Sequence, residues 1–313
     1  MSPVPTQTLC IGRLLVDAPA PARLRWTQET DVRFRRLDIE ERAAYDAYVS
    51  REEARYRQLP HKTEGTLLSN VQRPAEGWHV LFVRRNHLDG VGHKVAGYAW
   101  KGGNAYEIET LKYEREAFED VATTLVASLP ELRRVDDGES AEGPGFCIDH
   151  AVADPRGGRI MAGLSIESFA LRGVSLSLGV VENHASNPES SAAEGAFASL
   201  SEQEQQYRER MRSSGEDSIR DFKVLRREQK SVMGLSGEEG AYRVETSDGK
   251  VKYGFVWTSQ SRPDGRFPMA LSASLEAGAD EHVDDYTPPP DEEQLTALWD
   301  ALLASIKERP GAY

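Results

Sequence analysis

The chain has 313 residues, enough for one large domain or two of ordinary size. Hydrophobic residues make up 39% and charged residues 28%, a globular composition that excludes a disordered chain. No apolar run approaches the ~18 residues of a membrane-spanning helix, so no membrane insertion is expected. The formal net charge of −13 disfavours general binding to nucleic acid or anionic membranes and favours basic partners.

The first half of the sequence predicts alternating strands and helices. Residues 9–17 form a largely apolar run typical of one strand, and residues 23–37 alternate like its pairing partner. Tyrosines at helical spacing predict a helix over residues 39–59, and a later apolar stripe predicts another over residues 118–132. Between them we expect a meander with a tight turn at Gly102-Gly103. Its strands are GWHVLFVRR, KVAGYAWK and AYEIETLKY.

The second half repeats this order. Residues 147–154 predict a strand, residues 161–183 supply long alternating material, and residues 199–213 predict a charged amphipathic helix. A hairpin about Asp248-Gly249 carries a type I′ turn signal, and another strand follows it. The last helix is expected to begin at Asp291, whose carboxylate can cap it.

Two cysteines and two tryptophans stand at matching places in this repeated order. Cys10 and Cys147 open the first strand of each half, while Trp100 and Trp257 end corresponding meander strands. The sequence therefore predicts two copies of a β-β-α-β-β-β-α unit, an α+β protein of two similar tandem domains. Each domain is expected to be an antiparallel-rich sheet with helices packed on one face. The alternative is an α+β chain whose order repeats without duplication. The domains are expected at residues 1–140 and 141–313.

Motifs of known catalytic chemistry fail at particular residues. The strings GLSIE at 163 and GLSGE at 234 carry Glu where a nucleophile elbow needs its second Gly, which excludes a lipase or esterase reading. Phosphate-loop, zincin and dinucleotide fingerprints do not occur. We therefore expect no enzyme activity, no catalytic residue and no cofactor.

The histidines do not form a metal-binding pattern. Cys147 and Asp149 share one face of a predicted strand and His150 faces the other, which is poor geometry for a shared metal or a Cys/His pair. A structural or surface histidine is the favoured interpretation throughout, and no metal is expected. Three further histidines surround a hairpin without Cys or carboxylate ligands at metal spacing: His79, His87 and His93.

Charged stretches interrupt both halves. Residues 278–293 hold seven carboxylates around a triple proline, in an order that does not match a calcium loop. We expect a solvated polyproline connection that caps the last helix, with an acidic docking surface as the alternative. Residues 51–62 and 222–230 interleave basic and aromatic residues. Because Glu flanks both, solvated faces are favoured over nucleic-acid binding.

Five short motifs stand out along the chain: CIGRLLVDAP, GFCIDHAVADP, KVAGYAW, KYGFVW and YTPPPDEEQLTALWDALLASIK. Together they resemble the two-domain immunity proteins of bacterial type VI secretion phospholipase effectors. The resemblance covers nearly the whole chain, and its motifs are short and structural. It implies a periplasmic, non-enzymatic protein that binds a toxic secreted lipase in a 1:1 complex. It further implies that two domains clamp the effector's mobile lid and block access to the active site.

Some questions stay open at the level of sequence. The N-terminal MSPVPTQTL has no signal-peptide pattern, which indicates a cytoplasmic protein or a mature form without its leader. A cell-envelope ligand-binding or scaffold protein is the alternative function. Two buried thiols are slightly favoured over a Cys10–Cys147 disulfide, which an oxidising compartment would permit. Partner-binding residues are not identified.

Overall fold

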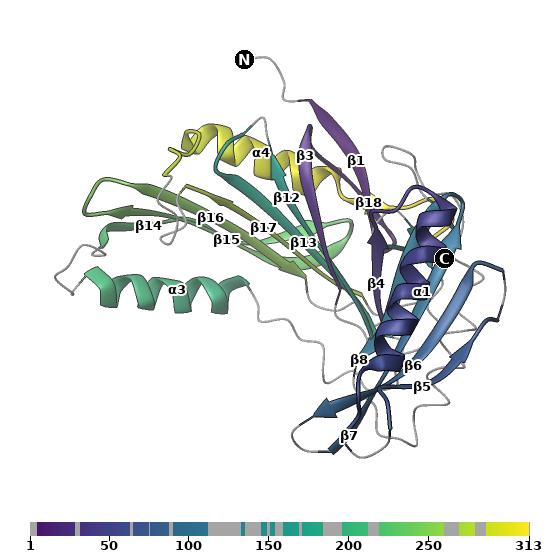
Figure 1. The fold of residues 1–313 in the computed structure, drawn as a ribbon. Helices are drawn as coiled ribbons and strands as arrows, with labels where there is room; N and C mark the ends of the chain where they lie inside the picture. The colour runs from purple at the N-terminus through teal and green to yellow at the C-terminus, as the bar shows by residue number, and fades with distance from the viewer. Residues whose placement is uncertain are drawn as a thin grey trace. The chain divides into compact units, whose positions relative to one another are not determined.

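The computed structural model shows an α+β protein with antiparallel sheets, the class expected from the sequence (Figure 1). Its residues divide into unit 1, Met1–Thr27 with Met161–Pro310, and unit 2, Gln28–Ile160 with Gly311–Tyr313. The residues that the structure describes are 5–28, 32–62, 65–74, 76–87, 90–111, 133–134, 145–148, 151–153, 159–168, 171–183, 196–211, 219–259, 269–278 and 286–312.

Unit 2 contains a five-stranded antiparallel sheet in the order β4-β8-β7-β6-β5 and a small sheet in the order β10-β11-β9. Helix α1 packs on the larger sheet through Tyr45, Val49 and Tyr56, which recur at helical spacing and are buried. Leu59, expected in the same stripe, is instead 42% exposed. The elements are β4 (Val32–Leu37), α1 (Arg42–Gln58), β5 (Leu68–Gln72), β6 (Trp78–His87), β7 (Gly90–Lys101), β8 (Asn104–Leu111), β9 (Arg133–Arg134), β10 (Phe146–Ile148) and β11 (Ala151–Ala153).

Unit 1 contains a seven-stranded sheet in the order β14-β15-β16-β17-β13-β12-β3 and a small sheet in the order β1-β2-β18. Two described helices, α3 and α4, belong to it. The elements are β1 (Thr6–Ile11), β2 (Leu14–Pro19), β3 (Ala22–Gln28), β12 (Arg159–Ser168), β13 (Val174–Asn183), α3 (Ala196–Met211), β14 (Ile219–Val232), β15 (Leu235–Thr246), β16 (Val251–Ser259), β17 (Met269–Ala277), α4 (Glu292–Ser305) and β18 (Lys307–Glu308).

The strand predicted over residues 9–17 is wrong, because the chain turns back on itself within it. Gly12 has φ of 59°, a left-handed conformation that favours glycine, and β1 and β2 pair with Ile11 opposite Leu14. The strand predicted over residues 147–154 is likewise two strands, β10 and β11, paired with Cys147 opposite Val152. Each half therefore opens with a hairpin.

The two hairpin turns predicted from glycines are confirmed. Gly102 and Gly103 have φ of 59° and 79° and connect β7 to β8, with Lys101 opposite Asn104. Gly249, with φ of 83°, turns β15 into β16. The structure adds β5 and β14 before the predicted meander strands. The helix predicted over residues 118–132 lies outside the described residues.

The helices of unit 1 lie on opposite faces of its large sheet, which corrects the expectation of helices on one face (Figure 1). Tyr207 of α3 contacts Tyr242 of β15, with ring centroids 6.0 Å apart. Trp299 of α4 contacts Phe255 of β16 at 5.9 Å. Phe255 pairs with Ala241, the neighbour of Tyr242, so the two contacts lie on opposite sides of the sheet. Buried apolar side chains stand on both faces, Tyr242 on one and Phe255 and Trp257 on the other, and a helix covers each.

Element order repeats along the chain. Each half begins with four strands, continues with a helix (α1 or α3), and then has four strands. Trp100 lies on β7 and Trp257 on β16, the third strand after the helix in both halves. The small sheets β1-β2-β18 and β10-β11-β9 also have matching orders. The division at residue 140 stays a prediction, since the two units combine segments from both sides of it.

Strand β14 forms one edge of the seven-stranded sheet. It is 14 residues long, and its pairing with β15 has register shifts between Ile219 and Asp221 and between Val224 and Arg226. Its sequence, IRDFKVLRREQKSV, carries five basic residues. This edge strand is irregular and strongly cationic.

Candidate functional site

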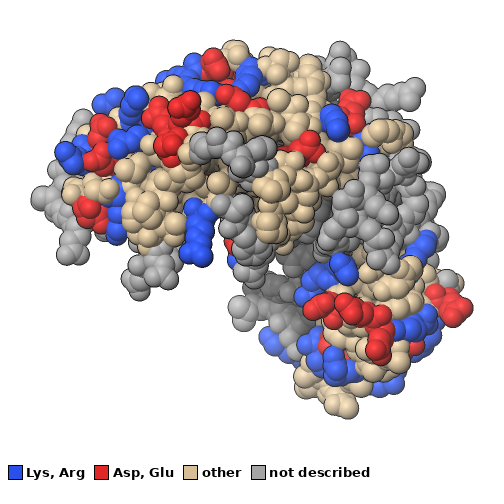
Figure 2. Space-filling view, turned by 90° about the horizontal axis from the view of Figure 1, so that it is seen from above, with Lys and Arg blue, Asp and Glu red and all other residues tan. Residues whose placement is uncertain are grey.

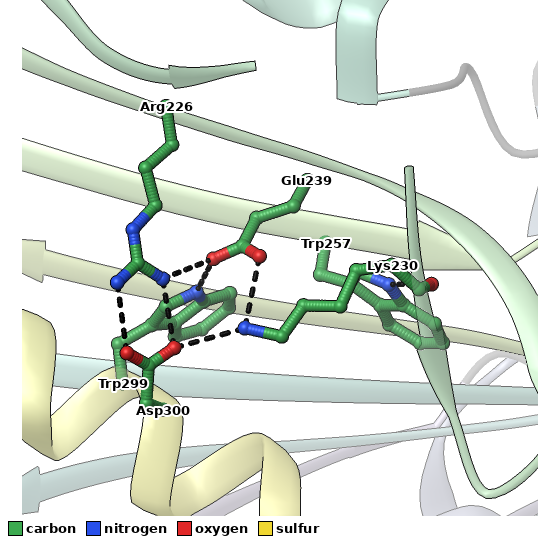
Figure 3. A network of polar contacts seen from close by, with 6 residues as sticks. All are labelled: Arg226, Lys230, Glu239, Trp257, Trp299 and Asp300. Carbon is green, nitrogen blue, oxygen red and sulfur yellow. Dashed lines mark hydrogen bonds and ion pairs between the residues drawn. The ribbon is translucent and has the colours of Figure 1, made fainter. Parts of the chain in front are cut away.

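A network of charged side chains joins β14, β15 and α4 in unit 1 (Figure 3). Glu239 of β15 is fully buried, and its Oε1 accepts hydrogen bonds from Trp299 Nε1 at 2.6 Å and Arg226 Nη1 at 2.9 Å. Lys230 Nζ lies 2.9 Å from Glu239 Oε2. Asp300 receives two hydrogen bonds from Arg226, at 2.7 and 2.8 Å, and one from Lys230 at 2.9 Å. Two carboxylates are therefore balanced by two cations.

Strand periodicity places these groups together. Arg226 and Lys230 are four residues apart on β14 and so point to one face. They pair with Ala241 and Gly237, which puts Glu239 diagonally between them on β15. Helix α4 then brings the neighbouring Trp299 and Asp300 to the same face, where the indole is buried and Asp300 stays 43% exposed.

The charges in this network stabilise one another. The hydrogen bonds from Arg226 are the largest influence on Asp300, and with Lys230 they hold the pKa of its carboxyl well below the usual range. The same contact with Asp300 raises the pKa of Arg226. Burial opposes the charged form of Lys230, but its hydrogen bonds to Asp300 and Glu239 outweigh burial and raise its pKa. Each of these three shifts favours the charged form of its group.

This arrangement suits structural fastening better than chemistry. The partners of Glu239 come from two elements, Arg226 and Lys230 from β14 and Trp299 from α4, and they hold its buried carboxylate between strand and helix. Trp257 of β16 adds a hydrogen bond from Nε1 to the Lys230 carbonyl oxygen at 3.1 Å. The network fixes α4 and the edge strand β14 onto the sheet.

A second charged group lies in unit 2. Glu107 of β8 pairs with Arg35 and accepts a hydrogen bond of 3.3 Å from the Tyr98 hydroxyl. Burial raises the pKa of Glu107 despite the Arg35 contact. Glu109, two residues along, pairs with Lys94. Burial opposes its charged form, but the hydrogen bond and charge of Lys94, together with Glu107 and Arg35, lower its pKa. These contacts stabilise the strand pairs β4-β8 and β7-β8.

The outer surface of α1 carries ordered arginine and tyrosine side chains, which we call the α1 patch (Tyr48, Arg51 and Arg55). The Arg51 guanidinium lies 5.4 Å from the centroid of the Tyr48 ring, and Arg55 lies 4.5 Å from the centroid of the Tyr56 ring. Tyr48 also contacts Tyr98 edge to face at 5.9 Å. The sheet beneath therefore holds Tyr48 in place while Arg51 and Arg55 reach solvent.

Charge elsewhere on the visible surface is mixed. Figure 2 shows Lys and Arg interspersed with Asp and Glu, without a wide area of one sign in that view. None of the described helices is long and apolar enough to cross a membrane.

Comparison with models of known protein families identifies the family of this chain. The model of the Tle cognate immunity protein 4 N-terminal domain matches residues 7–124, and the model of the C-terminal domain matches residues 139–311. The chain belongs to the Tle cognate immunity protein 4 (Tli4) family. Its resemblance to this class of immunity proteins was predicted from the sequence and is confirmed. Among curated protein sequences, the comparison found no match.

Solved structures share the whole Tli4 fold. The apo structure of the type VI secretion immunity protein TplEi from Pseudomonas aeruginosa aligns with a TM-score of 0.77 at 21% identity, over 98% of each chain. A chain in the crystal structure of a Tle4–Tli4 complex gives the same values. TplEi complexed with an "L" peptide aligns with a TM-score of 0.70 at 19% identity, over 97% of this chain and 98% of that one. At these identities the likeness concerns the fold.

The structure gives strand positions for three of the histidines singled out in this Tli4-family chain. His79 lies half-buried on β6, and the centroid of its ring is 6.2 Å from that of Tyr45. Its pKa is lowered, mainly by burial and to a smaller extent by the positive charge of Arg73. His87 and His93 lie on β6 and β7, where they are not register partners. Asp149 and His150 lie outside the described residues. Within the described part of the chain, no three His, Cys, Asp or Glu residues form a group that holds a metal.

The two serine strings of this Tli4-family chain lie on strands. Ser165 is within β12, and Ser236 follows the β14–β15 turn on β15. Neither stands on the strand-to-helix turn that a nucleophile elbow requires.

Both cysteines of this Tli4-family chain are disulfide-bonded in the structure. This corrects the slight preference for two free thiols at Cys10 and Cys147. Burial of cysteines in apolar strands was read as favouring thiols, but burial alone does not separate a thiol from a half-cystine.

Sequence reasoning missed the Glu239 network of this Tli4-family chain. Glu239 stands in SGEEG, a string that resembles an exposed turn. Its hydrogen-bond partner on α4, Trp299, is sixty residues further along the chain. The one available signal was the pair of basic residues at an even spacing on β14, which the sequence analysis treated as a solvated face.

Proposed function

We propose that this chain binds the cognate phospholipase effector of a type VI secretion system and neutralises it stoichiometrically. The observation that carries the proposal is the match of both Tli4 domain models, in order, over nearly the whole chain. One of the similar solved structures is itself a complex of Tle4 with Tli4. The partner proposed here is an effector of the Tle class.

Inhibition is proposed to be non-enzymatic. The best-formed polar cluster, around Glu239, is engaged by Trp299, Arg226 and Lys230 and serves packing. An inhibitor that works by occupancy needs a complementary surface and no reacting group. Clamping of the effector's lid, with the active site kept closed, is the mode we propose, and the periplasm is the proposed compartment.

The α1 patch is proposed as one set of binding anchors. Arginine and aromatic side chains dominate hot spots because they bury much area while losing little freedom when already ordered. Arg51 lies against Tyr48, and Tyr48 lies against Tyr98 of the sheet, so binding to an acidic or aromatic effector segment orders them little further. The overall charge of −13 complements a basic effector surface elsewhere and raises the association rate.

The test is a titration of effector activity together with periplasmic co-expression. The cognate lipase, directed to the periplasm, should be tolerated with this protein present and toxic without it. In vitro, lipase activity should fall linearly with added protein and reach zero at one equivalent. Protection at substoichiometric amounts would overturn the occupancy proposal, and equal toxicity with and without the protein would overturn immunity. A small ligand retained on purification would favour the cell-envelope alternative.

Matched variants test the anchors. Arg51→Ala should weaken effector binding at least about tenfold, the loss typical of an interface hot spot. Arg208→Ala, which removes an exposed arginine paired with Glu204 on α3, serves as the control. Equal affinities for the two variants would exclude Arg51 as an anchor while leaving the inhibitory function intact.

A further inference from the structure

Each opening hairpin pairs with a strand of the other half of the chain. The hairpin β1–β2 pairs with β18 at the C-terminal end, with Leu15 opposite Lys307 and Leu14 opposite Glu308. The hairpin β10–β11 pairs with β9 of the first half, with Ala151 opposite Arg134. The two small sheets are thus built by the same rule with the halves interchanged.

Contacts beyond strand pairing fix the first hairpin in unit 1. The Asp17 backbone N–H donates to Ser305 Oγ at 3.0 Å, at the end of α4. The Arg309 N–H donates to the Arg13 carbonyl oxygen at 2.8 Å. Helix α4 also packs against β2. All these partners come from the last tenth of the sequence.

Both hairpins carry buried apolar side chains. Ile11, Leu14 and Val16 are at most 1% exposed, as fully buried as Trp299 in α4. In unit 2, Phe146 of β10 is fully buried, and the Gly145 N–H donates to the carbonyl oxygen of buried Ala312 at 3.3 Å. Without its hairpin, each unit would expose apolar surface and an unpaired strand.

We infer that the two halves of the chain complete each other by exchanging their opening hairpins, so that each half is the binding partner of the other. Residues 1–134 carry the five-stranded sheet of unit 2 together with the hairpin β1–β2 and strand β3 of unit 1, and residues 145–313 carry the rest of unit 1 together with the hairpin β10–β11 of unit 2. The halves therefore remain associated when the peptide connection between them is cut. This holds independently of the proposed function.

Cleavage of the intact protein tests the association. A specific protease site is placed within residues 136–143, the folded full-length chain is cut, and the product is chromatographed at micromolar concentration with reductant present. The two fragments should elute together at the volume of the uncut chain and keep its unfolding midpoint within a few degrees. Separation into two folded fragments would overturn the inference. Uncut, reduced protein is the control for any effect of the disulfide.

Hydrogen exchange on the full chain tests which unit each hairpin stabilises. Leu14→Ala should accelerate amide exchange at least about tenfold in α4 and β17, and leave β6–β8 of its own half unchanged. Phe146→Ala should give the converse pattern. Acceleration centred on β6–β8 in Leu14→Ala would overturn the inference. Ser305→Ala removes the hydrogen bond with Asp17 without opening a cavity in the core. It should accelerate exchange in the same elements as Leu14→Ala, by a smaller factor, and it replaces Leu14→Ala in the experiment if that variant does not fold.

Discussion

Removal of the Glu239 carboxylate should loosen α4 from the large sheet of unit 1. Breaking a buried ion pair by removing one partner costs about 3–5 kcal/mol. Here the cost is lower, because Arg226 and Lys230 are 24% and 26% exposed and both keep Asp300. The Trp299 N–H, however, loses its acceptor, which costs about 1–3 kcal/mol for a buried donor. We expect Glu239→Ala to lower the free energy of unfolding by about 3 kcal/mol.

Urea unfolding followed by circular dichroism gives this difference from the shift in midpoint at constant slope. Glu239→Gln keeps an acceptor for the Trp299 indole and should lose about half as much, which separates the hydrogen bond from the charge. Glu276→Ala in β17 is the control, since its carboxylate is 57% exposed and 3.7 Å from Lys252. A loss below about 1 kcal/mol for Glu239→Ala, equal to that of an exposed pair, would refute the fastening role.

Three further outcomes follow from the described contacts. Arg226 lowers the folded-state pKa of Asp300, so the ionised carboxylate stabilises the fold above the unfolded pKa of about 3.9, and this stabilisation fades as pH falls below that value. Asp300→Asn should therefore flatten the decline of the free energy of unfolding at acid pH. An unchanged decline would contradict this role. Asp291 accepts a hydrogen bond from the Gln294 N–H at 2.8 Å, so Asp291→Ala should cost about 1 kcal/mol in urea unfolding. We propose that Cys10 and Cys147 are bonded to each other: denatured, unreduced monomer should titrate no free thiol, and two thiols would exclude the bond.

Local signals in the sequence predicted the helices and turns well. The Asp291 cap is confirmed, because capping depends on a side chain and an N–H only three residues apart. The paired glycines at Gly102-Gly103 are confirmed for the same reason. A single glycine, Gly12, was overlooked, and its positive φ is what divides the expected first strand. One such residue in an apolar run is a weak signal beside the hydrophobic pattern.

Long-range features were not predictable from periodicity. The burial of Glu239 depends on donors from β14 and α4, and no short window of sequence contains all three elements. The strands with which the two hairpins pair were equally unpredictable from the sequence. Because both halves have the same element order, β2 finds an equivalent strand in either half, and only tertiary packing selects β18 over β9.

The long edge strand β14 bears on how much of this protein a cell can hold. An inhibitor that acts one to one must accumulate at least to the level of its target, and concentrated sheets with flat, exposed edges polymerise edge to edge. The two register shifts in β14 bend its hydrogen-bonding groups out of line, and exposed charged side chains such as Arg220, Lys223 and Arg227 line the edge and disfavour its pairing with another strand. The irregular edge thus works against self-association at the concentrations that stoichiometric protection demands.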